Sequence, residues 1–356
     1  MKIIHTSDIH LYSPLTSRLD AEKIQKRKNE LLRTFERMVE AGLSDGVRIF
    51  IIAGDLFDTQ NINDRAWEHI FSVMENAKGM DFLYLTGNHE KDAISSYTRP
   101  LPKNLHLFSD EWTSYDYGYV CIYGKEKNED GMFDNLICNP SVKNIVVLHG
   151  ALTQSKGNDE NIDLRDAKDR GIDYMALGHY HFYSEKQIDQ RGVAVYSGTP
   201  EGRGFDEAHQ CGYVLIDTDG NSITHRFIPF ARRRIFDVES NISSAKNTTE
   251  VCTVIENDLC EADNGDIVRV TLTGERELST FINLPLIEER FNSRFFCFEI
   301  KDSSKIKINP HDYEYDKTLK GEYIRTILQD ESLDNREKDE LIRLGLSALS
   351  GELENI

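Results

Sequence analysis

The chain has 356 residues, of which 39% are hydrophobic and 29% are charged, a balance typical of folded proteins and not of disordered ones. Asp and Glu outnumber Lys and Arg by 61 to 42, and the net charge of −19 argues against a protein that coats nucleic acid. No apolar run approaches the ~18 residues that a membrane-spanning helix needs. The six cysteines include no Cys-x-x-Cys pair, and the first residues lack a signal-peptide pattern. We therefore predict a cytoplasmic protein of roughly two domains.

The first half of the chain alternates between predicted strands and predicted helices. Short apolar runs predict strands at residues 2–5, 47–53, 82–85, 145–148 and 174–177. Apolar residues at helical spacing predict helices at residues 21–41 and 64–77, and a further helix is expected near 164–169. This order is typical of an α/β fold, in which sites assemble beyond the carboxyl ends of the strands.

The rest of the chain follows a different pattern. Residues 193–196, 213–217 and 222–227 alternate like antiparallel strands, and Asp219-Gly220 supplies a hairpin turn between the last two. After a boundary near residues 229–234, an α+β domain is predicted, with strands at 234–238, 266–271 and 294–300 and helices at 249–261 and 280–290. Two helices follow, and the second begins with a capping-box pattern, Asp334 and Glu337. We predict three segments: residues 1–230, 231–305 and a helical tail at 306–356.

Five motifs follow the predicted strands, and their side chains are of the kinds that bind metals. They are Asp8-Ile9-His10, Gly54-Asp55-Leu56-Phe57-Asp58, Gly87-Asn88-His89-Glu90, His149-Gly150 and Gly178-His179-Tyr180-His181. Carboxylates, imidazoles and an amide suit divalent metals such as manganese, iron, zinc or nickel. Each motif alone is more typical of an ordinary turn or surface feature. All five together, each after an apolar strand, predict one metal centre.

The order of these motifs (DxH, GDxxD, GNHE, H, GHxH) resembles the calcineurin-like metallophosphoesterase superfamily over roughly residues 1–230. Within it, residues 5–8 and the segment 197–207 (SGTPEGRGFDE) resemble the SbcD-type DNA-repair exonucleases. The resemblance implies an α/β fold, a four-layer α/β/β/α sandwich of two mixed sheets with the site at one edge. It also implies that the α+β segment is a cap domain and that the tail docks onto the coiled-coil base of an SbcC-like, SMC-type ATPase.

The resemblance implies a role for each residue of the motifs. Seven residues would hold two metals, one bound by Asp8, His10, Asp55 and His181 and the other by Asp55, Asn88, His149 and His179. His89 would lie over the scissile phosphate as the catalytic group. Asp58 would orient a ligand imidazole without touching a metal.

Such a centre indicates a hydrolase. Two divalent ions, most readily Mn²⁺ with Fe, Zn, Ni or Mg as alternatives, would clamp a phosphodiester and lower the pKa of a bridging water towards ~7, so that hydroxide attacks phosphorus in line. His89 would then supply the proton that the leaving oxygen needs. We expect a DNA exonuclease, with some endonuclease activity, in repair or recombination. A phosphatase or phosphodiesterase for small nucleotides or phosphoproteins stays open because fold and metals do not fix the substrate. Two further possibilities also stay open, namely a non-catalytic scaffold for an ATPase and a homodimer.

Basic residues are the candidates for contact with phosphate groups. One cluster of Lys and Arg lies between Arg18 and Arg37, and a second is Arg232-Arg233-Arg234. A solvated helix face and a charged linker explain these clusters about as well. Arg203 lies in the family-like loop and is a better candidate for binding a substrate phosphate, with a structural salt bridge as the alternative.

Overall fold

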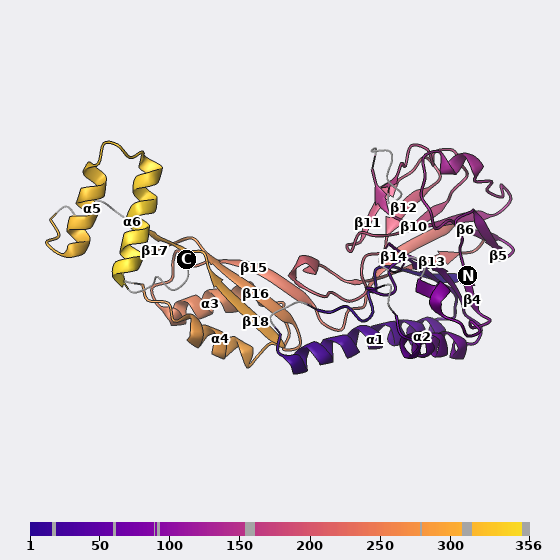
Figure 1. Ribbon diagram of the computed structural model, residues 1–356, viewed down its shortest axis with the longest axis horizontal. Coiled ribbons are helices and arrows are strands. Elements are labelled where there is room, and N and C mark those ends of the chain that lie inside the picture. The colour runs from indigo at the N-terminus through magenta and orange to yellow at the C-terminus, as the bar shows by residue number, and fades with distance from the viewer. Residues whose placement is uncertain are drawn as a thin grey trace. The chain divides into compact units, whose positions relative to one another are not determined.

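The computed structural model describes residues 1–15, 19–59, 62–88, 90, 93–153, 161–277, 280–307 and 315–350 (Figure 1). The chain divides into two compact units, Met1–Ile235 and Phe236–Ile356. Each unit contains hydrophobic core of its own. None of the described helices combines the length and the apolar composition that crossing a bilayer requires.

Two six-stranded sheets form the first unit, and both mix parallel with antiparallel pairs, as predicted. The first sheet, in spatial order, contains β14 (Ile223–Pro229), β13 (Gly212–Thr218), β1 (Lys2–Thr6), β2 (Val47–Ala53), β3 (Asp81–Leu85) and β4 (Leu105–Leu107). The second contains β11 (Ser184–Gln187), β12 (Val193–Tyr196), β10 (Tyr174–Gly178), β7 (Lys143–His149), β6 (Val120–Gly124) and β5 (Thr113–Asp116). The hairpin β13–β14 turns at Asp219, whose carboxylate accepts hydrogen bonds from the backbone N–H groups of Asn221 and Ser222.

The two sheets pack face to face through apolar side chains that alternate along each strand. Ile3, Ile49 and Ile51 of the first sheet share a buried cluster with Ile145 and Val147 of the second. The sequence neighbours in the first sheet, Ile4, Phe50 and Ile52, face the opposite way and pack under the helices. Strands buried on both faces read as continuous apolar runs, which is why β2 is easily predicted.

Helices α1 (Ala21–Ser44) and α2 (Asp64–Asn76) cover the outer face of the first sheet (Figure 1). Asp20 and Asn63 cap them by accepting hydrogen bonds from the N–H groups three residues on, each a contribution of about 1 kcal/mol. Phe35 from α1 and Trp67 from α2 enter the same core cluster. Both helices thus combine a capped N-terminus with an apolar face that packs on the sheet.

The second sheet lacks a comparable helical cover among the described residues. Its outer face packs on a 3₁₀ turn, η2 (Met132–Asn135), and on a run of turns at residues 164–169. The helix predicted there is wrong: the backbone forms turns in which the N–H of Asp166 donates to Asp163 O and that of Lys168 to Arg165 O, and the run ends at Asp169, whose φ of 60° does not fit a right-handed helix. Residues 193–196 also differ from prediction, because β12 pairs parallel with β10 and antiparallel only with β11.

A sheet with two helices forms the α+β part of the second unit. Strands β15 (Ile235–Asn241), β16 (Ile267–Thr273) and β18 (Cys297–Asp302) make the sheet, and β17 (Glu275–Glu277) pairs with β19 (Lys305–Lys307). Helices α3 (Thr248–Asp258) and α4 (Leu284–Asn292) contribute apolar residues to one cluster with this sheet. The predicted start of α4 at residue 280 is too early, because Asn283 provides the cap and Pro285 fits only the first turn.

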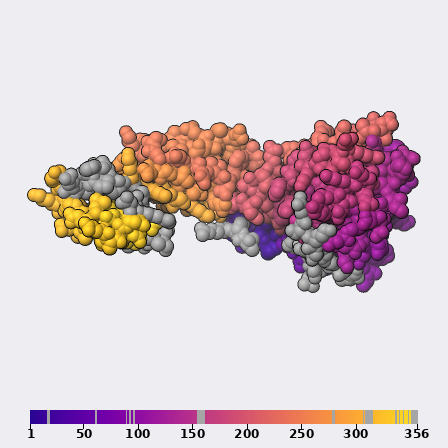
Figure 2. Space-filling view, turned by 90° about the horizontal axis from the view of Figure 1, so that it is seen from above, coloured from indigo at the N-terminus to yellow at the C-terminus, as the bar shows by residue number. Residues whose placement is uncertain are grey.

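Helices α5 (Leu319–Gln329) and α6 (Asn335–Ser350) form a pair with a small core of their own, yellow in Figure 2. Ile324 of α5 packs against Ile342 and Leu346 of α6. The predicted capping box is confirmed: the backbone N–H of Asp334 donates to Glu337 Oε2, and the N–H of Glu337 donates to Asp334 Oδ1, both at 2.9 Å.

Candidate metal centre

The motifs meet where parallel strands of both sheets end. Strands β1, β2 and β3 run parallel in the first sheet, and β7 and β10 run parallel in the second. Asp8, Asp55 and Asn88 follow the first three strands, whereas His149 ends β7 and His179 follows β10. Carboxyl ends of parallel strands share an edge, so side chains from distant parts of the chain gather there.

The structure brings six of the seven predicted ligands into contact with one another through their side chains. Asp8, His10 and His181 form one group whose ligand atoms all lie within 4.8 Å, and Asp8, Asp55 and His149 form another. Asn88 joins the second group, with its Oδ1 atom 3.0 Å from His149 Nε2. The shared residue of these two groups is Asp8.

Asp55, which the resemblance places between the two metals, lies between the same two groups. Its Oδ2 atom is 3.4 Å from His149 Nε2 and 3.8 Å from His10 Nε2. The seventh predicted ligand, His179, adjoins the cluster through its backbone and its ring. Its backbone N–H donates to Asp8 Oδ1 at 3.0 Å, and its ring packs edge-on against the ring of His149, with centroids 5.5 Å apart.

Three imidazoles of the cluster are held by their Nδ1 atoms. His10 Nδ1 lies 2.8 Å from Asp58 Oδ1, and His181 Nδ1 lies 2.7 Å from Glu207 Oε1. His149 Nδ1 lies 2.9 Å from the carbonyl oxygen of Ala53. Each of these partners is an acceptor, so Nδ1 carries a proton, and Nε2 is left as the atom through which the neutral imidazole would bind a metal. Arg203 Nη2 also lies 3.2 Å from His181 Nδ1.

This arrangement fits a bound cation. His10 Nε2 and His181 Nε2 are 3.3 Å apart beside the Asp8 carboxylate, so two potential ligand atoms face each other there. Burial alone would lower the pKa of His149, but the carboxylates of Asp55 and Asp8 outweigh burial and raise that pKa to about 9. The carboxylates thus favour positive charge at His149, and they would favour a divalent cation beside it for the same reason.

Backbone strain is concentrated at the same residues. Seven described residues other than glycine have a positive φ, and four of them are predicted ligands: Asp8, His10, Asp55 and His179. Such conformations cost on the order of 1–3 kcal/mol each and persist where the surrounding structure enforces them, commonly at functional sites. The strand ends are therefore shaped for the site at a cost in stability.

Two glycines let the strand ends approach the cluster. A Cβ atom on Gly87 would lie 1.9 Å from Asp55 Oδ1, and one on Gly54 would lie 2.0 Å from His149 Nδ1. Gly54 also has a φ of 92°, a conformation that favours glycine. Both motif glycines are thus required by close packing around the ligands.

Glu90 is a residue of the site to which the sequence analysis assigned no role. Its buried carboxylate accepts hydrogen bonds from the backbone N–H groups of Leu56 at 2.9 Å and Phe57 at 2.7 Å. It therefore fixes the turn between Asp55 and Asp58. Burial, with the nearby charge of Asp55, raises the pKa of Glu90 to about 8. Its neighbour His89 lies outside the described residues, so the catalytic role of His89 stays a prediction.

Arg203 contacts the carboxylates that hold the ligands. Its Nη2 atom donates to Glu207 Oε1 at 2.9 Å, and its Nη1 atom donates to Asp58 Oδ1 at 3.3 Å. Although burial opposes ionisation, His181 and Arg203 lower the pKa of Glu207 to about 2. Arg203 thus forms salt bridges, as the structural alternative for this residue predicted. Its contact with a substrate phosphate stays a prediction. Glu207 lies 26 residues beyond His181, a separation at which no local spacing reveals the contact.

Members of the two basic clusters are used inside the protein. Arg27 Nη1 is 2.6 Å from Glu30 Oε2 and 2.9 Å from Glu201 Oε1, and Arg233 Nη2 is 2.7 Å from Glu30 Oε1. Arg27 and Arg233 are only 1% and 7% exposed. For these two arginines neither phosphate contact nor a solvated helix face or linker describes the structure, because their guanidinium groups neutralise buried carboxylates.

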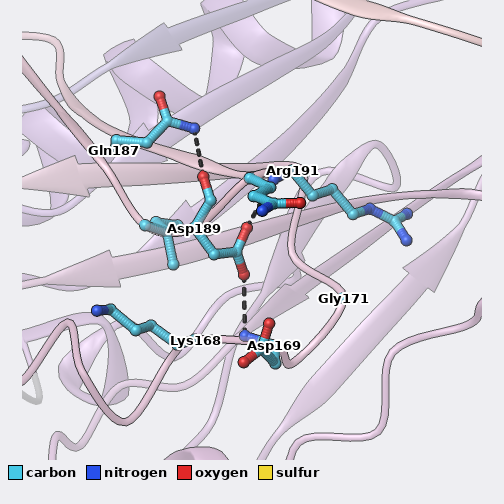
Figure 3. Close-up of a pocket in the computed structure, with 8 residues that line it drawn as sticks. Lys168, Asp169, Gly171, Gln187, Asp189 and Arg191 are labelled. Carbon is cyan, nitrogen blue, oxygen red and sulfur yellow. Dashed lines mark hydrogen bonds between the residues drawn. The ribbon is translucent and has the colours of Figure 1, made fainter.

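Away from the metal centre, a hollow of about 1010 Å³ lies between the turn near Asp169 and the loop joining β11 to β12 (Figure 3). The Asp189 carboxylate in it accepts hydrogen bonds from the backbone N–H groups of Asp169 and Gly192, both at 2.9 Å. Arg191 at its rim forms an ion pair with Asp173 at 2.7 Å. These groups hold the two loops together, so the hollow has a structural explanation.

Known proteins resemble the chain in the same region. The model of the calcineurin-like phosphoesterase family matches residues 1–183, more than half of the chain. "Uncharacterized metallophosphoesterase YhaO" of Bacillus subtilis is 26% identical over 280 residues, covering 72% of this chain and 67% of the relative. "DNA double-strand break repair protein Mre11" of Methanopyrus kandleri is 24% identical, covering 64% of this chain and 56% of the relative. The protein of the same name from Methanosarcina mazei is 23% identical, covering 85% of this chain and 50% of the relative.

The chain thus spans about half to two thirds of the length of these relatives. The family uses a centre of two metal ions, and the Asp and His cluster described above offers the ligand types for one. The chain belongs to the calcineurin-like phosphoesterase family and is a hydrolase of phosphoester bonds.

Proposed function

We propose that the chain is a metal-dependent DNA nuclease, an exonuclease with some endonuclease activity, that serves DNA repair or recombination in the cytoplasm. The observation that carries the catalytic part is the convergence of three Nδ1-anchored imidazoles on the carboxylates of Asp8 and Asp55. The relatives called DNA double-strand break repair protein Mre11 support DNA as the substrate. The segment 197–207 supports it too, because it resembles the corresponding segment of SbcD-type DNA-repair exonucleases.

The proposed ligands divide as the family resemblance implies. Asp8, His10, Asp55 and His181 would hold one ion, and Asp55, Asn88, His149 and His179 the other. Two such ions, most readily Mn²⁺, would supply a water-derived nucleophile at neutral pH and would offset the negative charge of the phosphoryl oxygens.

The chain's own residues prepare this centre. Asp58 and Glu207 fix two imidazoles, and Arg203 balances the charge of those two carboxylates. Glu90 holds the turn that presents Asp55. His89 would donate the proton that the leaving oxygen needs near neutral pH.

The experiment compares cleavage of single-stranded DNA, double-stranded DNA and mononucleotides with Mn²⁺, with Mg²⁺ and with EDTA. We expect Mn²⁺-dependent DNA cleavage that Asp55→Asn abolishes and that the exposed turn variant Asp130→Asn retains. We expect His89→Asn to bind metal and to lose turnover. Rapid turnover of mononucleotides without DNA cleavage would overturn the proposal in favour of a small-nucleotide phosphodiesterase, which the net charge of −19 favours.

The later segments are proposed to serve the same function. The α+β part would cap the DNA, and the pair α5 and α6 would dock onto an SbcC-like, SMC-type coiled-coil ATPase. Leu319 and Leu344 are exposed apolar residues of this pair that offer a docking contact. Deletion of residues 316–356 should abolish association with that ATPase and leave metal-dependent hydrolysis intact. Unchanged association would count against the docking role.

A further inference from the structure

Two exposed aromatic side chains lie next to the metal ligands. Tyr180 is 37% exposed and Phe182 is 50% exposed, and they alternate in sequence with His179 and His181. Large apolar rings that gather at the surface commonly mark a site of interaction. The pair is continuous with the candidate metal centre, so its partner is expected to be part of what the centre cleaves.

The rings form an ordered stack. Tyr180 and Phe182 lie with centroids 5.7 Å apart and planes inclined by 24°. Tyr180 also contacts the ring of His179 at 5.4 Å and packs edge-on against Tyr196 at 4.9 Å. The hydroxyl of Tyr196 donates to the carbonyl oxygen of Gly150 at 2.8 Å, beside His149. The stack is thus supported by residues that neighbour ligands on both β7 and β10.

The chemistry of the stack selects one kind of partner. Aromatic rings offer a flat apolar face and no charge, so they suit a flat group attached to the phosphate and not the phosphate itself. In a duplex each base is already covered on both faces by its neighbours, whereas an unpaired base has a free face. We propose that Tyr180 and Phe182 form a platform on which an unpaired nucleobase next to the scissile phosphate stacks.

This inference rests on the proposed nuclease function and deepens it, because it makes single-stranded DNA or a frayed end the form that is cleaved. Removal of a base-stacking aromatic typically weakens binding by about 5- to 100-fold. A platform that acts on the base predicts that this loss appears only with substrates that have bases. An aromatic pair that merely supports the His179 and His181 segment predicts an equal loss for all substrates.

The experiment measures kcat/KM with Mn²⁺ for a single-stranded thymidine oligonucleotide and for an abasic oligonucleotide of the same length. The variants are Tyr180→Ala, Phe182→Ala and their double variant, with Phe182→Tyr as the conservative replacement. Tyr119→Ala is the matched control. Tyr119 is 44% exposed and precedes β6, so it lies at the opposite end of the parallel strands from the ligands.

For the wild type we expect the thymidine substrate to be preferred over the abasic one by about 5- to 100-fold. The double alanine variant should reduce this preference to about one, whereas Phe182→Tyr and Tyr119→Ala should keep it. Equal cleavage of both substrates by the wild type, or an unchanged preference in the double variant, would overturn the platform and leave the nuclease function standing. Failure of the wild type to cleave either oligonucleotide would overturn the nuclease function, and the platform with it.

Discussion

His5 connects the two sheets of the first unit as a buried neutral imidazole. Its Nδ1 atom lies 2.9 Å from the hydroxyl of Tyr174, and its Nε2 atom lies 3.2 Å from the carbonyl oxygen of Leu177. The carbonyl can only accept, so Nε2 carries the proton and Nδ1 accepts from Tyr174. Burial is the main cause that lowers the pKa of His5 to about 3, although the Leu177 carbonyl opposes it. The folded protein therefore binds a second proton at His5 only at strongly acidic pH.

The consequence for stability follows from proton linkage. The unfolded chain binds a proton at His5 near pH 6.5, while the folded chain does so only near pH 3. The contribution of His5 is thus complete above pH 6.5 and is lost as the pH falls below that value. At 1.36 kcal/mol per pH unit, we expect a loss of about 2 kcal/mol between pH 7.5 and pH 5 from this group.

The assay is urea unfolding at pH 7.5 and at pH 5, in EDTA so that metal release does not contribute. Trp67 and Trp112, the chain's two tryptophans, both lie in the first unit, so tryptophan fluorescence reports on that unit. His5→Gln keeps a donor for the Leu177 carbonyl and cannot titrate. Its free energy of unfolding should depend on pH less steeply than that of the wild type, by about 2 kcal/mol over this range. Identical pH dependence in the two proteins would refute the buried neutral imidazole.

Three further substitutions test the site and its support. Gly87→Ala places a Cβ atom 1.9 Å from Asp55 Oδ1, so Mn²⁺ affinity measured by calorimetry should fall at least about tenfold; unchanged affinity would contradict the close packing. Glu207→Gln loosens one ligand imidazole and should cost about 10- to 100-fold in metal affinity or in kcat, and wild-type values for both would show that Glu207 does not position it. Glu201→Gln removes a charge from the buried arginine network and should lower the free energy of unfolding by about 3–5 kcal/mol in urea titrations, against less than about 1 kcal/mol if the network is dispensable.

The parts of the fold that could be predicted are those with a local signal. The strands β2 and β7 are buried on both faces, so their sequences are continuous apolar runs that end at a ligand type. The edge strands β5 and β11 have polar, partly exposed sequences with no such signal, and prediction missed both. The turns at residues 164–169 misled prediction because short apolar spacing alone does not distinguish a helix from packed turns.

The candidate site shows the same division. Ligand types are visible in the motifs because chemistry restricts them to carboxylate, imidazole and amide groups. The groups that orient the ligands come from distant sequence: Glu207 contacts His181, and Arg203 contacts Asp58 across 145 positions. Only folding brings such pairs together. Glu90 was within a recognised motif, yet its role as acceptor for the Asp55 turn depends on burial that the sequence does not display.

Asp8, Asp55 and the histidines around them are proposed to hold two ions. Calorimetric titration of the metal-free protein with Mn²⁺ tests it most directly. We expect two ions per chain for the wild type and weaker, incomplete binding for Asp55→Asn, since Asp55 lies between both groups. A single ion per wild-type chain, or two ions bound equally well by Asp55→Asn, would contradict it.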